Sequence, residues 1–297
     1  MREPVFEGSG VAIITPFLKD GGIDFPKLGE LIDFQADSGT DAVIICGTTG
    51  ESSTQSLEEH IAAVDFCVKH TAGRMKVIAG AGSNDTNAAV FLSQHAKKSG
   101  ADATLVVTPY YNKATQAGLI KHYTYIADRV DIPMILYNVP SRTGLSFAAE
   151  TYAALAKHPN INGVKEASGN FSLIASTRAL CPDDFYLWSG NDDQVVPLMS
   201  LGGKGVISVV ANILPELTKN MSHLCLEGNF KEAAKLQTEN MKFINSLFIE
   251  VNPIPIKAAM NLAGFGVGEC RLPLCEMTSK NLEILKENMV DMGIQIK

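Results

Sequence analysis

One lysine stands where a buried strand is expected. Residues 161–167 read INGVKEA, and Lys165 is the only basic residue in this run. Burial disfavours the charged ammonium and raises the share of neutral, nucleophilic amine, which can form a Schiff base with a ketone. By two-residue alternation Gly163 and Ala167 share its face, and we expect them to leave a cavity around the amine. An ordinary lysine that reaches solvent or pairs with a carboxylate is the alternative.

A tyrosine and an arginine follow the preceding apolar run, MILYNV, which ends at Val139. The Tyr137 phenol could pass a proton to or from a bound carbonyl, although a strand tyrosine more often only packs its ring. Arg142 offers a planar fork that suits a substrate carboxylate, and a solvated surface arginine is an equal alternative.

Two threonines lie between glycines after the second apolar run, in the sequence Gly47-Thr48-Thr49-Gly50. Their hydroxyls and the neighbouring backbone N–H groups could bind a carboxylate, and a plain turn is the alternative. Tyr110 and Tyr111 follow the fourth run.

The acidic run Asn191-Asp192-Asp193 could suggest a hard metal ion, but we favour helix capping. Of the histidines only His60 has a position of interest. The six cysteines show no C-x-x-C spacing, so we expect reduced thiols and no zinc or redox site.

Eight short apolar runs would position these side chains. They end at Pro16, Gly47, Gly82, Pro109, Val139, Ala167, Gly190 and Ala211. Segments with helical periodicity separate them, so strand and helix alternate, which favours a parallel sheet covered on both faces. Eight units predict an α/β fold, a closed (β/α)8 TIM barrel, in which catalytic groups lie at the carboxyl ends of the strands. No dinucleotide-binding or P-loop glycine pattern occurs.

From about residue 214 the chain reads as helix only, without a flexible linker. One helix completes the barrel and about three remain. We therefore predict a catalytic barrel over residues 1–228 and a C-terminal helical extension over 229–297, docked on the barrel or on a neighbouring subunit.

The composition narrows the class of protein. Of 297 residues, 46% are hydrophobic and 19% charged, which is typical of a globular chain with a large core. The net charge of -7 gives no indication of a basic surface that would bind nucleic acid or an anionic membrane. With no membrane-spanning run and no signal-peptide pattern, we expect a cytoplasmic protein.

Several motifs taken together resemble the pyruvate-dependent class I aldolase and lyase family. The resemblance runs nearly end to end and is carried by GTTGES (47–52), VTPYYN (107–112), YNVPSRTG (137–144), GVKEASG (163–169), SGND (189–192), NPIPIKAAMNLAG (252–264) and RLPL (271–274). It is greatest for members that condense pyruvate with L-aspartate 4-semialdehyde, an early step of lysine biosynthesis.

The resemblance implies a role for each matching residue. Lys165 would form the Schiff base with pyruvate, and Tyr137 would be the general acid and base. Thr48 would link Tyr137 to Tyr111, which would reach into the site of a neighbouring subunit. The substrate-binding residues would be Thr49, Gly190 and Ile207 for pyruvate and Arg142 for the semialdehyde carboxylate. It also implies a homotetramer of tight dimers and chemistry that needs no metal or organic cofactor.

N-acetylneuraminate lyase and 2-keto-3-deoxy-sugar-acid aldolases share the lysine, the tyrosine and the threonine loop, so they stay open as alternatives. Two residues at the positions of the family's lysine-inhibition site differ from those of lysine-inhibited relatives. Lysine-inhibited relatives carry a histidine at the position of Leu57 and a glutamate at that of Ala88, whereas Ser52, His60, Asn84 and Tyr110 match. We therefore predict weak or absent inhibition by lysine.

Overall fold

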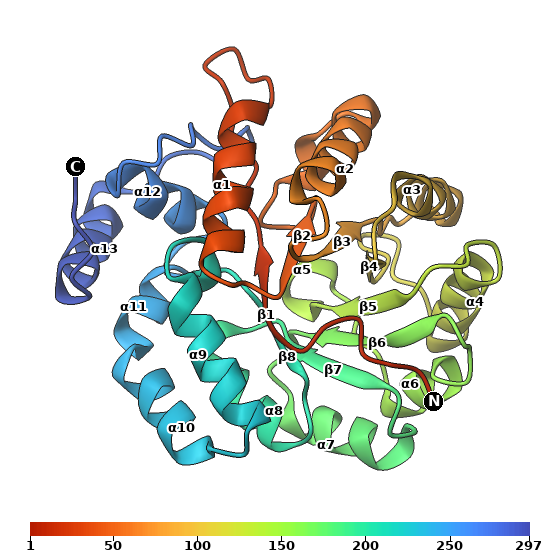
Figure 1. The fold of residues 1–297 in the computed structure, drawn as a ribbon. Coiled ribbons are helices and arrows are strands. Elements are labelled where there is room, and N and C mark those ends of the chain that lie inside the picture. Colours follow the sequence, from red (N-terminus) through yellow and green to blue (C-terminus); the bar gives the residue numbers. More distant parts are fainter.

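Eight parallel strands close into a barrel in the order of the sequence, with β1 hydrogen-bonded to β8. The computed structural model describes all residues 1–297. The strands are β1 (Gly8–Ala12), β2 (Ala42–Ile45), β3 (Lys76–Gly80), β4 (Ala103–Val107), β5 (Met134–Asn138), β6 (Ile161–Glu166), β7 (Tyr186–Ser189) and β8 (Gly205–Ser208). Figure 1 shows the ring of helices around them, and the predicted TIM barrel is confirmed.

Helices follow the strands along the chain. They are α1 (Phe25–Asp37), α2 (Leu57–Thr71), α3 (Thr86–Ser99), α4 (Gln116–Ala127), α5 (Pro140–Thr143), α6 (Ala149–Leu155), α7 (Phe171–Leu180), α8 (Val195–Ser200) and α9 (Pro215–Leu226). Short 3-10 turns lie at Ser52–Thr54, Asp192–Gln194 and Val210–Asn212. Local sequence sets the helix ends: α2 begins at a capping box between Ser56 and Glu59, and α3 ends at Gly100, whose φ of 91° suits glycine.

Apolar side chains fill both sides of the sheet. Inside the barrel, Ile44, Ile78, Leu105 and Trp188 belong to one buried cluster, while larger clusters lie between the strands and the helices. Burial of the strands on both faces explains why most of the eight runs are apolar along their whole length.

The N-terminal segment closes the amino end of the barrel, and Figure 1 shows it crossing the strands there. The Phe6 ring stacks on Trp188 with centroids 5.4 Å apart, and the Trp188 indole N–H donates to the Phe6 carbonyl over 3.1 Å. Substrate access is therefore confined to the other end, where the strands have their carboxyl ends.

The C-terminal extension packs against the barrel. It contains α10 (Phe230–Glu239), α11 (Met241–Ser246), α12 (Ile254–Leu262) and α13 (Ser279–Asp291), so four helices remain beyond α9. The expected number of about three was wrong because residues 229–248 divide at Asn240 between α10 and α11. Phe243, Met260 and Leu285 join the same buried cluster as strand residues of β1 to β3, which ties the extension to the barrel.

Two further features concern the chain as a whole. All six cysteines are free thiols, and four of them are buried. None of the helices is both long enough and apolar enough to cross a membrane.

Candidate active site

Lys165 and Tyr137 meet inside the carboxyl end of the barrel. They are direct register partners on the neighbouring strands β5 and β6, and the Lys165 Nζ lies 4.3 Å from the centre of the Tyr137 ring. Their exposed fractions are 6% and 7%. An amine and a phenol are thus held together out of bulk water, as expected for residues at the carboxyl ends of adjacent barrel strands.

Glu166, the next residue on β6, fixes the inward direction of Lys165. Its carboxylate accepts hydrogen bonds from Asn138 Nδ2 (3.0 and 3.1 Å), the Tyr152 hydroxyl (2.9 Å) and the Ser168 N–H (2.8 Å). Burial raises the pKa of this carboxyl against those hydrogen bonds, which lower it. Because neighbouring strand residues face opposite sides, a Glu166 anchored outside the barrel sends Lys165 inside.

Gly190 lies against the Lys165 side chain. A Cβ on Gly190 would lie 3.0 Å from Lys165 Cε and 2.8 Å from the Ala167 Cβ, so only glycine leaves the lysine its present path. Ile207 on β8 is buried in the interior cluster that also contains Tyr137.

Our expectation for Gly163 was wrong. A Cβ there would lie 2.0 Å from the Tyr186 carbonyl oxygen, so Gly163 allows β6 and β7 to approach closely and opens no space around the amine.

The threonine loop begins where β2 ends, and left-handed backbone at Cys46 and Glu51 (φ 55° and 54°) turns it back over the barrel. Thr48 and Tyr137 line one small cavity of about 50 Å³. Thr49 is buried, and its hydroxyl oxygen accepts a hydrogen bond from Asn252 Nδ2 over 3.0 Å. The loop is therefore adjacent to the lysine and tyrosine pair.

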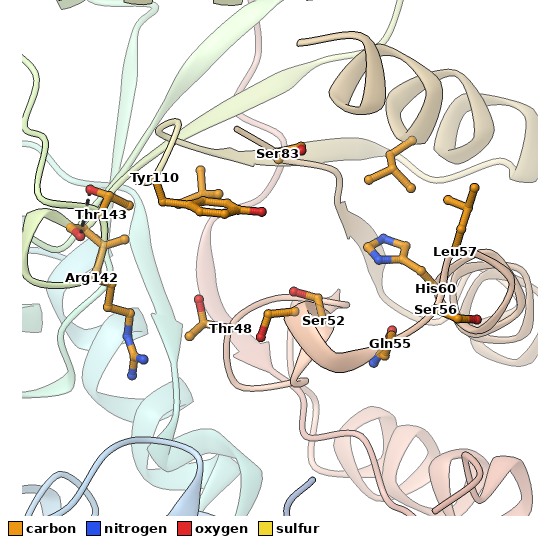
Figure 2. A pocket seen from close by; sticks show the side chains of 15 residues that line it. Thr48, Ser52, Gln55, Ser56, Leu57, His60, Ser83, Tyr110, Arg142 and Thr143 are labelled. Carbon is orange, nitrogen blue, oxygen red and sulfur yellow. Dashed lines mark hydrogen bonds between the residues drawn. The ribbon is translucent and has the colours of Figure 1, made fainter. Parts of the chain in front are cut away.

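Arg142 borders a larger cavity of about 510 Å³, which Thr48 and Tyr110 also line. It comes from the one-turn helix α5, directly after the strand that carries Tyr137. Figure 2 shows Arg142 and Thr48 in this cavity with Tyr110. The Arg142 Nη2 donates to the Asn252 carbonyl over 3.0 Å, which leaves the other guanidinium N–H groups available to a carboxylate.

Tyr111 lies at the surface of the chain. Its side chain is 91% exposed, and its backbone is left-handed with φ 72°. Tyr111 lines neither of the two cavities that Thr48 borders, so the predicted link from Tyr137 through Thr48 to Tyr111 is not seen within this chain.

Four of the six predicted regulatory positions line the larger cavity. Ser52, His60, Tyr110 and Leu57 line it, whereas Asn84 and Ala88 do not. His60 is hydrogen-bonded through Nε2 to the Gly80 carbonyl (2.7 Å), and burial lowers its pKa. Leu57 presents only an apolar side chain here, so this part of the cavity lacks the polar group that the resemblance would place there.

Asp192 is a capping residue, although not of its own helix. It is buried and accepts hydrogen bonds from the Ser208 hydroxyl and the N–H groups of Val209 (2.9 Å) and Val210 (3.3 Å), which caps the turn after β8. Burial raises the pKa of its carboxyl, and those hydrogen bonds oppose the rise. No cluster of three or more His, Cys, Asp or Glu side chains has the geometry of a metal site.

The sequence interpretation missed two features of the site. Glu51 and Lys257 form a buried ion pair of 2.9 Å that joins the threonine loop to α12. Asn252 contacts both Thr49 and Arg142. Glu51, Asn252 and Lys257 all lie in motifs that carried the family resemblance. The motifs therefore marked these residues as members of the family pattern, but they did not indicate that the residues contact one another.

Comparison with known proteins decides the family. The dihydrodipicolinate synthetase family matches residues 5–291. The chain belongs to this family. The 4-hydroxy-tetrahydrodipicolinate synthase of Caldicellulosiruptor saccharolyticus is 55% identical over 294 residues, with 99% of each chain covered.

Solved structures of the family share the whole fold. The dihydrodipicolinate synthase of Aquifex aeolicus is 45% identical with a TM-score of 0.96, covering 98% of this chain and 100% of that one. The chloride-inhibited enzyme of Acinetobacter baumannii, solved in complex with pyruvate, is 41% identical with a TM-score of 0.95, covering 97% and 99%. The family resemblance read from the motifs is confirmed.

Proposed function

We propose that the chain is a 4-hydroxy-tetrahydrodipicolinate synthase, which condenses pyruvate with L-aspartate 4-semialdehyde on the way to diaminopimelate and lysine. The observation that carries the proposal is the buried primary amine of Lys165, 4.3 Å from the Tyr137 ring at the carboxyl end of the barrel. Relatives bearing that enzyme name are 55% identical over nearly the whole chain.

The first half-reaction loads pyruvate onto the enzyme. The neutral Lys165 amine attacks the ketone carbon, water leaves, and an imine forms. Tyr137 supplies the proton that the departing oxygen needs, because its phenol lies beside the amine. Thr49 and nearby backbone N–H groups bind the pyruvate carboxylate, while Gly190 and Ile207 shape the space around the methyl group.

The second half-reaction makes the carbon–carbon bond. Loss of a methyl proton converts the imine to an enamine, whose carbon attacks the aldehyde of the semialdehyde. The amino group of the new chain then displaces Lys165 from its imine carbon, which closes the ring and restores the free lysine. Thr48 and Tyr111 carry protons between Tyr137 and the surface.

Arg142 favours the semialdehyde over the sugar-derived aldehydes of the alternative family members. Its guanidinium borders the cavity beside Thr48, where a second substrate would enter, and a carboxylate matches its fork geometry. N-acetylneuraminate lyase and 2-keto-3-deoxy-sugar-acid aldolases act on aldehydes without a carboxylate at this place.

A steady-state assay with pyruvate and each aldehyde in turn tests the proposal. We expect turnover with L-aspartate 4-semialdehyde and none above background with N-acetylmannosamine or glyceraldehyde. Turnover with one of the sugar-derived aldehydes in preference to the semialdehyde would contradict it. Arg142→Ala is expected to raise KM for the semialdehyde while leaving imine formation with pyruvate nearly unchanged.

We also propose that the active enzyme is a homotetramer of tight dimers, in which Tyr111 completes the site of a neighbouring subunit. The 91% exposure of an aromatic ring on a left-handed backbone supports this, because such a ring gains no packing within its own chain. Sedimentation of the wild type and of Tyr111→Phe measures the assembly, and the same two proteins show whether the hydroxyl matters for turnover.

A further inference from the structure

Asn252 lies in the segment between α11 and α12 and touches two of the proposed substrate-binding residues. Its side-chain Nδ2 donates to the Thr49 Oγ1 over 3.0 Å. Its backbone carbonyl accepts from the Arg142 Nη2, also over 3.0 Å. The residue is 7% exposed, and its contact with Thr49 is buried, whereas its contact with the exposed Arg142 is partly buried. One residue of the C-terminal extension thus links two loops that follow different strands.

The direction of the first hydrogen bond determines what the Thr49 hydroxyl can do. A threonine hydroxyl has one hydrogen to donate, whereas an amide NH₂ group can only donate. Since Asn252 Nδ2 donates, the hydroxyl oxygen of Thr49 is the acceptor and its hydrogen must point elsewhere. That hydrogen has no acceptor within the chain, and Thr49 is 3% exposed. A buried donor is thereby left for a ligand.

The Asn252 side chain makes no hydrogen bond other than the one to Thr49. Its Oδ1 is buried and has no hydrogen-bond partner, so Thr49 is the only group that the side chain holds. An unpartnered buried oxygen is unfavourable, which makes a purely structural use of this asparagine inefficient.

We infer that Asn252 is a positioning residue, which turns the hydroxyl hydrogen of Thr49 toward the pyruvate carboxylate and holds Arg142 in place for the carboxylate of the second substrate. The inference rests on the proposed function. It assigns to the C-terminal extension an indirect part in substrate binding, since the donors for both carboxylates depend on one residue of that extension.

Asn252→Asp tests the inference because it preserves shape and replaces the donating NH₂ by an accepting oxygen. The Thr49 hydroxyl would then donate to this oxygen and be lost to pyruvate. The readout is borohydride trapping of the imine at increasing pyruvate concentration. We expect the half-saturating concentration to rise about tenfold or more, while the maximal rate of trapping changes less than about threefold.

A double-mutant cycle with Thr49→Val separates the hydroxyl from the new charge. If Asn252 acts through Thr49, then Asn252→Asp adds less than about a twofold rise in a chain that already carries Thr49→Val. An equal rise in both backgrounds would overturn the inference, because the charge would then act by itself. An unchanged half-saturating concentration in Asn252→Asp would overturn it as well.

Asn252→Leu is the alternative test variant if Asn252→Asp does not fold. It removes the donor and leaves the hydroxyl free to rotate, so we expect a rise of about threefold, and no rise would overturn the inference. Asn261→Asp is the matched control, since this asparagine of α12 donates to the Gly268 carbonyl over 2.9 Å, away from the site. Wild-type protein that forms no trapped imine would refute the proposed function itself, whereas normal trapping in both wild type and Asn252→Asp would refute only this inference.

Discussion

Two lysines are buried in this protein, and they differ in what surrounds the amine. Lys165 and Lys257 are 6% and 2% exposed, and their Nζ atoms lie 4.3 Å and 4.4 Å from the ring centres of Tyr137 and Phe17. The Lys257 Nζ also donates to Glu51 Oε1 (2.9 Å) and to the Glu269 carbonyl (2.7 Å). Lys165 has no carboxylate within ion-pair distance.

The difference separates a structural lysine from a reactive one. The Lys257 amine is held by a carboxylate and a carbonyl, so this lysine joins the threonine loop to α12. The Lys165 amine has no such partners. The buried carboxylate of Asp192, which follows β7, accepts hydrogen bonds from Ser208 and two backbone N–H groups. Both lysines are buried, so burial alone does not separate them. They differ in the hydrogen-bond partners of the amine.

Replacing Lys165 should produce the largest loss of activity. Lys165→Arg keeps a long cationic side chain but has no primary amine, so imine formation becomes impossible. We expect turnover to fall by about four orders of magnitude or more. Thermal unfolding should change little in comparison with any change at Lys257. Retention of more than a hundredth of the wild-type rate would contradict the assignment of the nucleophile.

Replacing Lys257 should reverse this pattern. Lys257→Met leaves the Glu51 carboxylate buried and unpaired, and we expect a loss of about 3–5 kcal/mol in the free energy of unfolding. Denaturant unfolding measures the loss. Adding Glu51→Gln to Lys257→Met should restore part of the stability, because the unpaired charge is then removed. Equal stability of the single variant and the wild type would show that the ion pair has no structural role.

His122 extends the comparison to a third buried ionisable group. Its Nδ1 is hydrogen-bonded to the Thr86 hydroxyl (2.9 Å), its Nε2 has no partner, and burial lowers its pKa from 6.5 to about 4. Below pH 6.5 the unfolded chain therefore takes up a proton that the folded chain refuses until about pH 4. The free energy of unfolding therefore keeps the full contribution of the neutral imidazole above pH 6.5. As the pH falls from 6.5 to about 4, it decreases by about 3 kcal/mol at most.

Chemical denaturation between pH 7 and pH 4 checks the His122 prediction. We expect His122→Asn to show a shallower decline in unfolding free energy with falling pH than the wild type. Identical slopes for the two proteins would mean that another group controls the acid sensitivity.

The smallest expected effect concerns L-lysine as an inhibitor. Leu57 offers no hydrogen bond in the far part of the larger cavity, and Ala88 supplies no charge nearby. We expect L-lysine to leave the steady-state rate nearly unchanged at sub-millimolar concentrations. A half-inhibitory concentration in that range would contradict this expectation, and the paired change Leu57→His with Ala88→Glu is expected to increase inhibition.

The sequence predicted the eight strands, because each is a short, mostly apolar run and most of the runs are bounded by glycine or proline. The bounds were less accurate: β1 was expected to end at Pro16 but covers Gly8–Ala12. Ile13, Ile14 and Thr15 are buried beyond the strand, so their apolar pattern follows burial in the core more closely than pairing in the sheet. The helix α5, with four residues, is too short to show a period.

Some residues of the site could be placed from the sequence around them, whereas contacts between residues far apart in the sequence could not. Lys165 and Tyr137 could be placed at one end of the barrel because each lies near the carboxyl end of an apolar run, which is a local property of the sequence. The contact between Asn252 and Thr49 joins residues 203 positions apart, and that between Lys257 and Glu51 joins residues 206 apart. No local pattern indicates such a meeting, since it depends on how the C-terminal extension packs against the barrel.

Borohydride reduction in the presence of pyruvate, followed by mass analysis of the peptides, tests the central claim most directly. The account predicts that the peptide with Lys165 gains the mass of pyruvate less one water plus two hydrogens. The peptide with Lys257 should stay unmodified, although both amines are buried. An unmodified Lys165, or equal modification of the two lysines, would contradict the account.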